Sequence, residues 1–228
     1  MESLDELPWN VHKEGVIVGI FKAGQVEYDD EINVIHELIK TFLYILTIAL
    51  LIFLIWNYVG CRSEVIGHSM EETLYDGESV WLDKITYRFQ EPARYDIVVF
   101  PYQGSETNFI KRIIGLPGET IYIDPEGRIY IGTEETLYIE ADGSIHNEAE
   151  QLEEDYGREV IQEGKRGIAE EPLTLGADEY FVMGDNRNNS QDSRYETVGP
   201  ISKDILEGRV AFRLWPLNVF GNVDKKEK

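Results

Sequence analysis

A run of residues without charge, from Thr41 to Cys61, constrains the fold of this chain more than any other feature. Most of it reads FLYILTIALLIFLIWNYV. As a helix rising ~1.5 Å per residue, this run roughly matches the ~30 Å hydrocarbon core of a bilayer. Trp56 and Tyr58 lie near its end, where aromatic rings favour the membrane interface. We therefore predict a transmembrane anchor at residues 41–61.

Three structures other than a permanent anchor could account for this apolar run. A buried core helix could have the same composition. A cleaved secretory signal fits poorly, because residues 1–40 precede the run and no A-x-A site follows it. A lipoprotein-type site ending at Cys61 would need a small aliphatic residue where Tyr58 stands.

The charges that flank the anchor predict its orientation. Lys22 and Lys40 precede it, and Arg62 alone lies in the same window after it. Cytoplasmic flanks carry the excess of lysine and arginine. The bias favours a cytoplasmic leader, residues 1–40, and an extracytoplasmic domain, residues 62–228.

Composition excludes several classes of function. The net charge of −22 makes nucleic acid an unsuitable partner, because phosphate binding needs clustered lysine and arginine. Adhesion to anionic lipid by charge alone is excluded for the same reason. Cys61 is the single cysteine, so neither an intramolecular disulfide nor a cysteine-rich metal site can form.

After the anchor, short alternating runs separated by turn residues predict an antiparallel, mainly β domain. Glu126-Gly127 between two such runs predicts a hairpin. The predicted strands are Ser79–Asp83, Asp96–Phe100, Phe109–Ile114, Thr120–Ile123, Arg128–Ile131, Tyr180–Met183 and Arg209–Leu214.

The composition changes between Thr133 and Pro172. Thirteen acidic residues face only Arg158, Lys165 and Arg166 there, and the apolar periodicity is weak. A charge run of this kind is typical of a solvated surface. We predict a solvent-facing acidic insertion at about 133–172, between two halves of the β domain.

The histidines do not support a Ser-His-Asp triad. His12 and His36 precede or border the membrane span, and His146 lies in the acidic insertion. His68 adjoins Ser69 in sequence, an awkward geometry for deprotonating that same serine. No His-Glu pair has metal-ligand spacing, so we expect neither a metal nor a cofactor.

Lys111 is the stronger candidate for a base. If Phe109–Ile114 is a strand, alternation places Phe109, Lys111 and Ile113 on one face and Arg112 on the other, where it can stay charged. Large apolar neighbours lower a lysine pKa from its usual ~10.4. A neutral amine beside a serine hydroxyl can act as a general base. The ordinary alternative is an edge lysine whose amine extends to water.

Two other segments complete the pattern. Ser69 lies just beyond the anchor, and a serine beside glycine means nothing alone. Residues 183–194 are dense in Gly, Asn, Asp and Ser, which predicts a turn rich in hydrogen bonds from side chains to the backbone.

Together these segments resemble the bacterial type I signal peptidases over roughly residues 41–216. The matching boxes are Ser69-Met70 with Thr73-Leu74, Tyr95–Phe100, Lys111–Glu119, and Gly184–Ser190 with Asp192-Ser193-Arg194. The resemblance implies a signal-peptidase/LexA-like antiparallel β fold with an N-terminal transmembrane helix. It also implies a plasma-membrane serine endopeptidase that removes signal peptides from exported preproteins and cuts after small residues.

Carried over residue by residue, the resemblance implies roles for the site. Ser69 would attack the scissile carbonyl, Lys111 would take its proton, and the Ser69 backbone N–H would donate to the oxyanion. Ser190 would hydrogen-bond the lysine amine. A salt-bridged support would consist of Asp192, Arg194 and Arg112.

Two positions depart from the family pattern. Glu72 replaces the usual proline three residues after the nucleophile, which removes a backbone constraint and adds a charge. Gly67 cannot supply the hydroxyl that some members add to the oxyanion hole. One such donor can be worth about 10²-fold in rate.

Two other functions compete with this one. A self-cleaving repressor-type protease shares the Ser/Lys chemistry, but it needs a DNA-binding domain and a soluble chain. A membrane-tethered β domain that only binds a partner would leave the serine inert.

Overall fold

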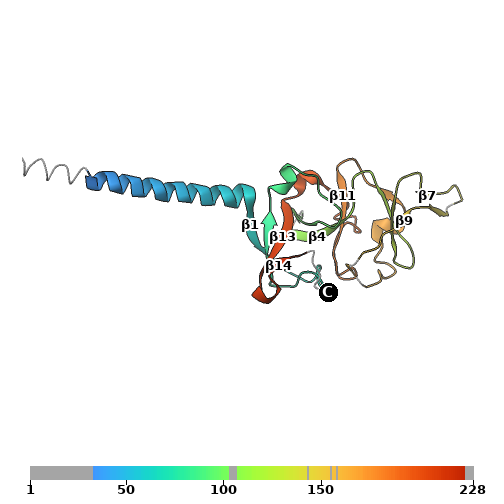
Figure 1. The fold of residues 1–228 in the computed structure, drawn as a ribbon. Helices are drawn as coiled ribbons and strands as arrows, with labels where there is room; N and C mark the ends of the chain where they lie inside the picture. Colours follow the sequence, from blue (N-terminus) through green and yellow to red (C-terminus); the bar gives the residue numbers. More distant parts are fainter. Residues whose placement is uncertain (1–32, 103–106, 143, 155, 158, 224–228) are drawn as a thin grey trace, which may run out of the picture. The chain divides into compact units, whose positions relative to one another are not determined.

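The computed structural model describes residues 33–102, 107–142, 144–154, 156–157 and 159–223. The predicted leader therefore lies outside the described residues up to residue 32. The chain divides into two compact units between Leu54 and Ile55 (Figure 1).

An apolar helix, Asn33–Val59, covers the predicted anchor. Its last turn, η1 (Ile55–Val59), is a π-helix. Large apolar side chains such as Phe42 and Leu51 are exposed along it, and a helix of 27 residues rises ~40 Å. By length and composition it is able to cross a membrane.

The helix ends two residues before the predicted end of the anchor. Gly60 begins strand β1 (Gly60–Glu64), which pairs with β2 (Ser79–Asp83). A Cβ at Gly60 would lie 2.4 Å from the Leu82 carbonyl oxygen, so glycine permits this close strand contact. Gly60 and Cys61 thus belong to the β-sheet rather than to the anchor.

The β domain is built on one large antiparallel sheet. Within the described residues it has eight strands in the order β1-β2-β13-β3-β4-β11-β12, with β14 paired to β13. The remaining strands of this sheet are β3 (Ile97–Pro101), β4 (Asn108–Gly115), β11 (Glu179–Met183), β12 (Ile201–Ser202), β13 (Gly208–Trp215) and β14 (Gly221–Asn222).

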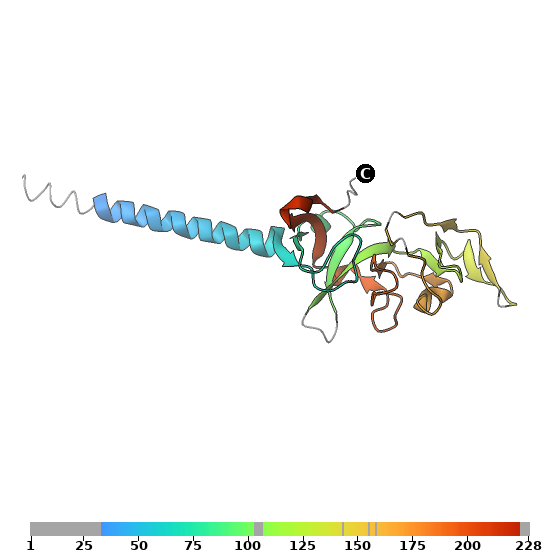
Figure 2. The ribbon, with the colours of Figure 1, turned by 90° about the horizontal axis from the view of Figure 1, so that it is seen from below.

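A smaller antiparallel sheet follows the order β10-β5-β6-β9, and β7 pairs with β8 in a separate hairpin. Within the β domain, this hairpin lies at one end and β13-β14 at the other (Figures 1 and 2). These strands are β5 (Thr120–Ile123), β6 (Ile129–Gly132), β7 (Leu137–Ile139), β8 (Ile145–Asn147), β9 (Glu150–Gln151) and β10 (Leu173–Thr174).

Short 3-10 helices occur in the connections. They are η2 (Thr86–Arg88), η3 (Gly167–Glu170), η4 (Lys203–Ile205) and η5 (Leu217–Val219).

The predicted mainly β, antiparallel fold with an N-terminal helix is confirmed. The seven predicted strands match β2, β3, β4, β5, β6, β11 and β13, each within one residue at either end. Gly127 has φ +78° in the β5–β6 turn, which is the predicted hairpin.

The prediction of a solvent-facing insertion at 133–172 is wrong in part. Leu137, Ile161 and Ala169 are buried, and Ile161 and Ala169 pack into a core with Ile121 and Phe181. Strand β9 extends the smaller sheet by pairing with β6. Single apolar residues spaced irregularly among acids carry this packing, so no periodicity signals it.

Candidate active site

Ser69 lies in the turn that connects β1 to β2. Met70 and Leu74, which follow it, are buried in a core with Val80 and Val99. The Leu74 amide donates to the Met70 carbonyl oxygen at 2.8 Å. These contacts fix the turn and leave Ser69 half-buried.

Glu72 in the same turn has φ +79°. Proline is locked near φ −65° and cannot adopt this conformation. The turn of this chain therefore differs from one that carries proline at this position.

Lys111 projects from β4 toward Ser69. Its Nζ lies 2.9 Å from Ser69 Oγ and 2.8 Å from the Ile110 carbonyl oxygen. The residue is 3% exposed, and the Phe109 ring centroid lies 4.8 Å from Nζ. The predicted proximity of Ser69 and Lys111 is thus present in the structure.

Burial lowers the pKa of Lys111 to about 8, against the carboxylates of Asp192 and Asp185, which raise it. Removing an ammonium from water disfavours its charged form. Both carboxylates bind arginines rather than the lysine amine.

Ser69 and Lys111 line a cavity of about 510 Å³. Val65, Val99 and Phe109 contribute apolar surface to its wall.

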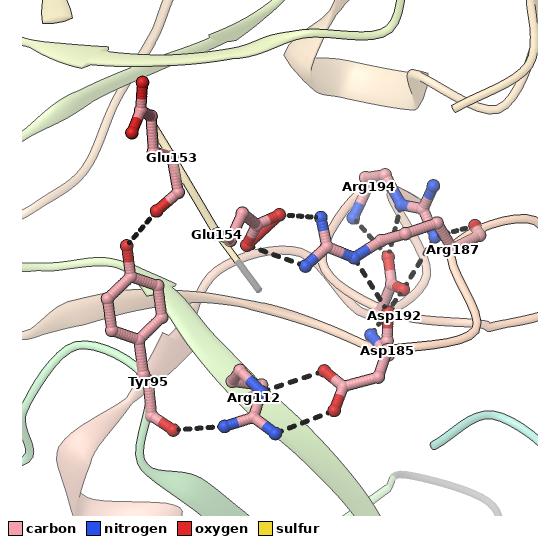
Figure 3. Close-up of polar contacts among 9 residues, drawn as sticks. Tyr95, Arg112, Glu153, Glu154, Asp185, Arg187, Asp192 and Arg194 are labelled. Atoms are coloured by element: carbon pink, nitrogen blue, oxygen red, sulfur yellow. Dashed lines mark hydrogen bonds and ion pairs between the residues drawn. The ribbon is translucent and has the colours of Figure 1, made fainter. Parts of the chain in front are cut away.

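Two buried ion pairs involve residues of β4 and of the turn after β11 (Figure 3). Arg112 donates to Asp185 from Nε at 2.9 Å and from Nη2 at 2.7 Å. Arg194 donates to both carboxylate oxygens of Asp192, each at 2.8 Å. All four side chains are almost fully buried.

The residues of the predicted support, Asp192, Arg194 and Arg112, lie in two separate buried ion pairs. Arg112 pairs with Asp185, a residue to which the sequence assigned no role. Arg112 lies on β4, 73 positions before Asp185, and sequence separation hides such a pair.

The turn after β11 is hydrogen-bonded to the loop between β1 and β2 that contains Ser69. The Asn186 amide donates to the Ser69 carbonyl oxygen at 3.1 Å, and Asn186 Nδ2 donates to the His68 carbonyl oxygen at 3.0 Å. A Cβ at Gly184 would lie 2.4 Å from the Ser69 carbonyl oxygen. Only glycine allows the two backbones to approach this closely.

Ser190 differs from its prediction. Its Oγ is buried, and it makes no hydrogen bond to any residue that the structure describes. The predicted bond to Lys111 is not formed, because Nζ is directed at Ser69 Oγ and the Ile110 carbonyl oxygen. A buried hydroxyl without a partner costs roughly 1–3 kcal/mol, so Ser190 is available for a partner.

The Ser69 amide donates to no backbone carbonyl in the described part of the chain. His68 is exposed and contacts Glu71 at 2.6 Å. His146 lies in β8, stacked on Tyr138. His36 lies in the N-terminal helix, and His12 lies outside the described residues.

A serine hydroxyl within hydrogen-bond distance of a buried lysine of lowered pKa is what a serine hydrolase with a lysine base requires.

Comparison with known proteins identifies the family to which the chain belongs. Residues 36–215 match the family of signal peptidases, peptidase S26. A probable signal peptidase I-2 from Synechocystis sp. is 33% identical over 189 residues, or 79% of this chain and 73% of the relative. A signal peptidase I from Bacillus licheniformis is 32% identical over 197 residues, covering 84% and 95%.

A crystal structure of a signal peptidase I from Enterococcus faecalis V583 aligns at 30% identity and a TM-score of 0.39, covering 54% of this chain and 98% of that one. The family match spans well over half of the sequence. The chain therefore belongs to the signal peptidase family, peptidase S26, and is a serine endopeptidase.

Proposed function

We propose that this chain removes N-terminal signal peptides from exported preproteins, with Ser69 as nucleophile and Lys111 as general base. The observation that carries the proposal is the 2.9 Å contact between Lys111 Nζ and Ser69 Oγ, with a lysine pKa lowered to about 8. Relatives named signal peptidase I support the choice of substrate.

The reaction follows from these two groups. The neutral Lys111 amine takes the Ser69 proton as Oγ attacks the scissile carbonyl carbon. The Ser69 amide donates to the resulting oxyanion. Lys111 then returns the proton to the leaving amine as the peptide bond breaks, which leaves an acyl-serine. Lys111 next deprotonates a water that attacks the acyl-serine carbonyl carbon, and it returns that proton to Ser69 Oγ as the C–Oγ bond breaks, which releases the new carboxyl group and restores the enzyme.

The supporting residues hold this geometry. Asp192 with Arg194, and Asp185 with Arg112, fix the turn and the strand on either side of the pair. Ser190, whose hydroxyl has no partner among the described residues, can turn toward the Lys111 amine when its charge changes during the reaction.

The predicted anchor would locate the reaction at the membrane surface. The family is membrane-anchored, and the helix Asn33–Val59 is able to span a bilayer. The flanking charges orient the leader to the cytoplasm and the β domain to the outer side of the plasma membrane. A preprotein with its signal peptide in the same bilayer would present its cleavage site to Ser69.

Substrate choice follows from the cavity. An extended peptide can add to a strand edge, so that backbone hydrogen bonds bind it while side-chain pockets discriminate. Val99 and Phe109 line the cavity together with Ser69, and the resemblance to signal peptidases implies small residues at the first and third positions before the cut.

The test is cleavage of a preprotein by the full chain in detergent micelles, followed by the mass of the product. We expect wild type to release the mature protein and Ser69→Ala to release none. His146→Ala, which changes a side chain in the β7–β8 hairpin, should cleave like wild type. Equal cleavage by Ser69→Ala and wild type would refute the proposal. Binding of the preprotein without cleavage by wild type would favour a non-catalytic β domain.

A further inference from the structure

Part of the acidic insertion, residues 153–154 and 156–157, lies against Arg187 and Arg112 near the turn after β11. Glu154 accepts two hydrogen bonds from Arg187, from Nη1 and from Nη2, the latter at 2.8 Å (Figure 3). The Tyr156 ring stacks on Arg112, with Cζ 3.5 Å from the ring centroid. The Glu153 carbonyl oxygen accepts a hydrogen bond from the Tyr95 hydroxyl.

These arginines hold the turn that contacts the nucleophile loop. Arg187 Nε donates to the Gly184 carbonyl oxygen at 3.1 Å, and Arg112 binds Asp185. The next residue, Asn186, donates to the Ser69 carbonyl oxygen. A chain of direct contacts thus runs from the insertion to the residue that bears the nucleophile.

The buried positive charge of Arg187 is balanced by an acid of the insertion. Arg187 is 2% exposed, and its ion-pair partner among the described residues is Glu154. Burial alone would lower the pKa of Arg187, but the Glu154 carboxylate offsets that and raises it. Without Glu154, a buried guanidinium would lack a directly bound carboxylate and would be drawn toward other acceptors or water.

Close packing against Arg187 also constrains the insertion at Gly157. Gly157 has φ +62°, and a Cβ there would lie 2.6 Å from Arg187 Nε. Glutamate, aromatic ring and glycine therefore contact the arginines from one short stretch of chain.

We propose that Glu154 and Tyr156 are positioning residues of the active site, which hold the turn Gly184–Asn186 against the Ser69 loop through Arg187 and Arg112. The proposal rests on the function proposed above. It gives the acidic insertion a part in catalysis, in place of a purely solvated surface.

Glu154→Gln tests the charge, and Glu153→Gln is its matched control, because it makes the same change at an exposed neighbour. With the full chain in micelles, we expect Glu154→Gln to lower kcat about 10- to 100-fold, since small misplacements of reacting groups cost this much. KM should stay within about twofold, because the substrate cavity does not include Glu154. Glu153→Gln should match wild type, and Glu154→Asp should recover part of kcat.

Tyr156→Leu should lower kcat in the same way, and Tyr156→Phe, which keeps the ring, should restore it. Each kcat is divided by the folded fraction, measured by tryptophan fluorescence in the same micelles. A variant that loses folded protein but keeps wild-type kcat per folded molecule would overturn the positioning role. So would a wild-type kcat in Glu154→Gln beside an inactive Ser69→Ala, and the proposed function would then stand. Cleavage by Ser69→Ala would refute both the positioning role and the proposed function.

Discussion

The protonation state of Lys111 decides how fast this site can work at neutral pH. With a pKa of ~10.4, an exposed lysine is neutral in about one molecule in 2,500 at pH 7. With the pKa lowered to about 8, Lys111 is neutral in roughly one molecule in eleven. Burial thus raises the reactive fraction roughly 200-fold, which corresponds to ~3 kcal/mol.

The assay is kcat/KM for a preprotein or a peptide that spans its cleavage site, measured from pH 6 to pH 10 with the full chain in micelles. A base must be neutral to accept a proton, so activity should rise about tenfold per pH unit below pH 8 and level off above it. Lys111→Arg and Lys111→Ala should both be inactive throughout, because guanidinium keeps its proton in this range and alanine has none to exchange.

Two results would refute this reasoning. One is a rising limb that persists in Lys111→Ala. The other is a midpoint near pH 6.5 that disappears in His68→Ala, because ~6.5 is the ordinary pKa of histidine. Either would assign the base to another residue.

Four further outcomes follow from the same contacts. Lys111→Met should raise the free energy of unfolding by about 1–2 kcal/mol at pH 7, because the cost of burying the ammonium exceeds that of the lost hydrogen bonds. In urea titrations this gain should shrink above pH 8, since the unfolded lysine keeps its proton to ~10.4 and wild-type stability therefore rises with pH across that window. Asp192→Asn should abolish cleavage and cost about 3–5 kcal/mol in the same titrations, because Arg194 stays buried without its partner. Glu72→Pro should cost about 3 kcal/mol or more, whereas Glu72→Gly should be neutral or stabilising, and equal melting temperatures would contradict the positive φ. Replacing alanine by leucine at the first position before the cut should abolish cleavage in a peptide assay, and equal rates would refute the proposed preference for small residues.

The strands that could be predicted from the sequence are those with their own pattern. Thr120–Ile123 and Ser79–Asp83 alternate or run apolar between turn residues, and both appear at their predicted bounds. The two-residue strands β9 and β10 have no such pattern, because pairing with a neighbour alone defines them. Local sequence does not contain that information.

β alternation and apolar neighbours predicted a lowered pKa at Lys111, and the family resemblance implied its pairing with Ser69. The Ser190 hydrogen bond was carried over from the resemblance, and the structure directs the lysine amine elsewhere. Asp185 stood inside a recognised motif, yet its partner Arg112 lies on a distant strand. Glu154 was hidden further, because it is one acid in a run of thirteen.

The distribution of carboxylates explains why burial can lower the pKa of Lys111. Among the described residues, each buried arginine near the turn has a directly bound acid: Asp185 for Arg112, Asp192 for Arg194 and Glu154 for Arg187. These pairs give each buried guanidinium a hydrogen-bonded partner and fix the turn. Lys111 Nζ hydrogen-bonds only to a hydroxyl and a carbonyl oxygen there, and Asp192 and Asp185, which do not bind it directly, offset its burial only in part. The acids that stabilise the turn therefore bind arginines and not the Lys111 amine, which can act as a base when it is neutral.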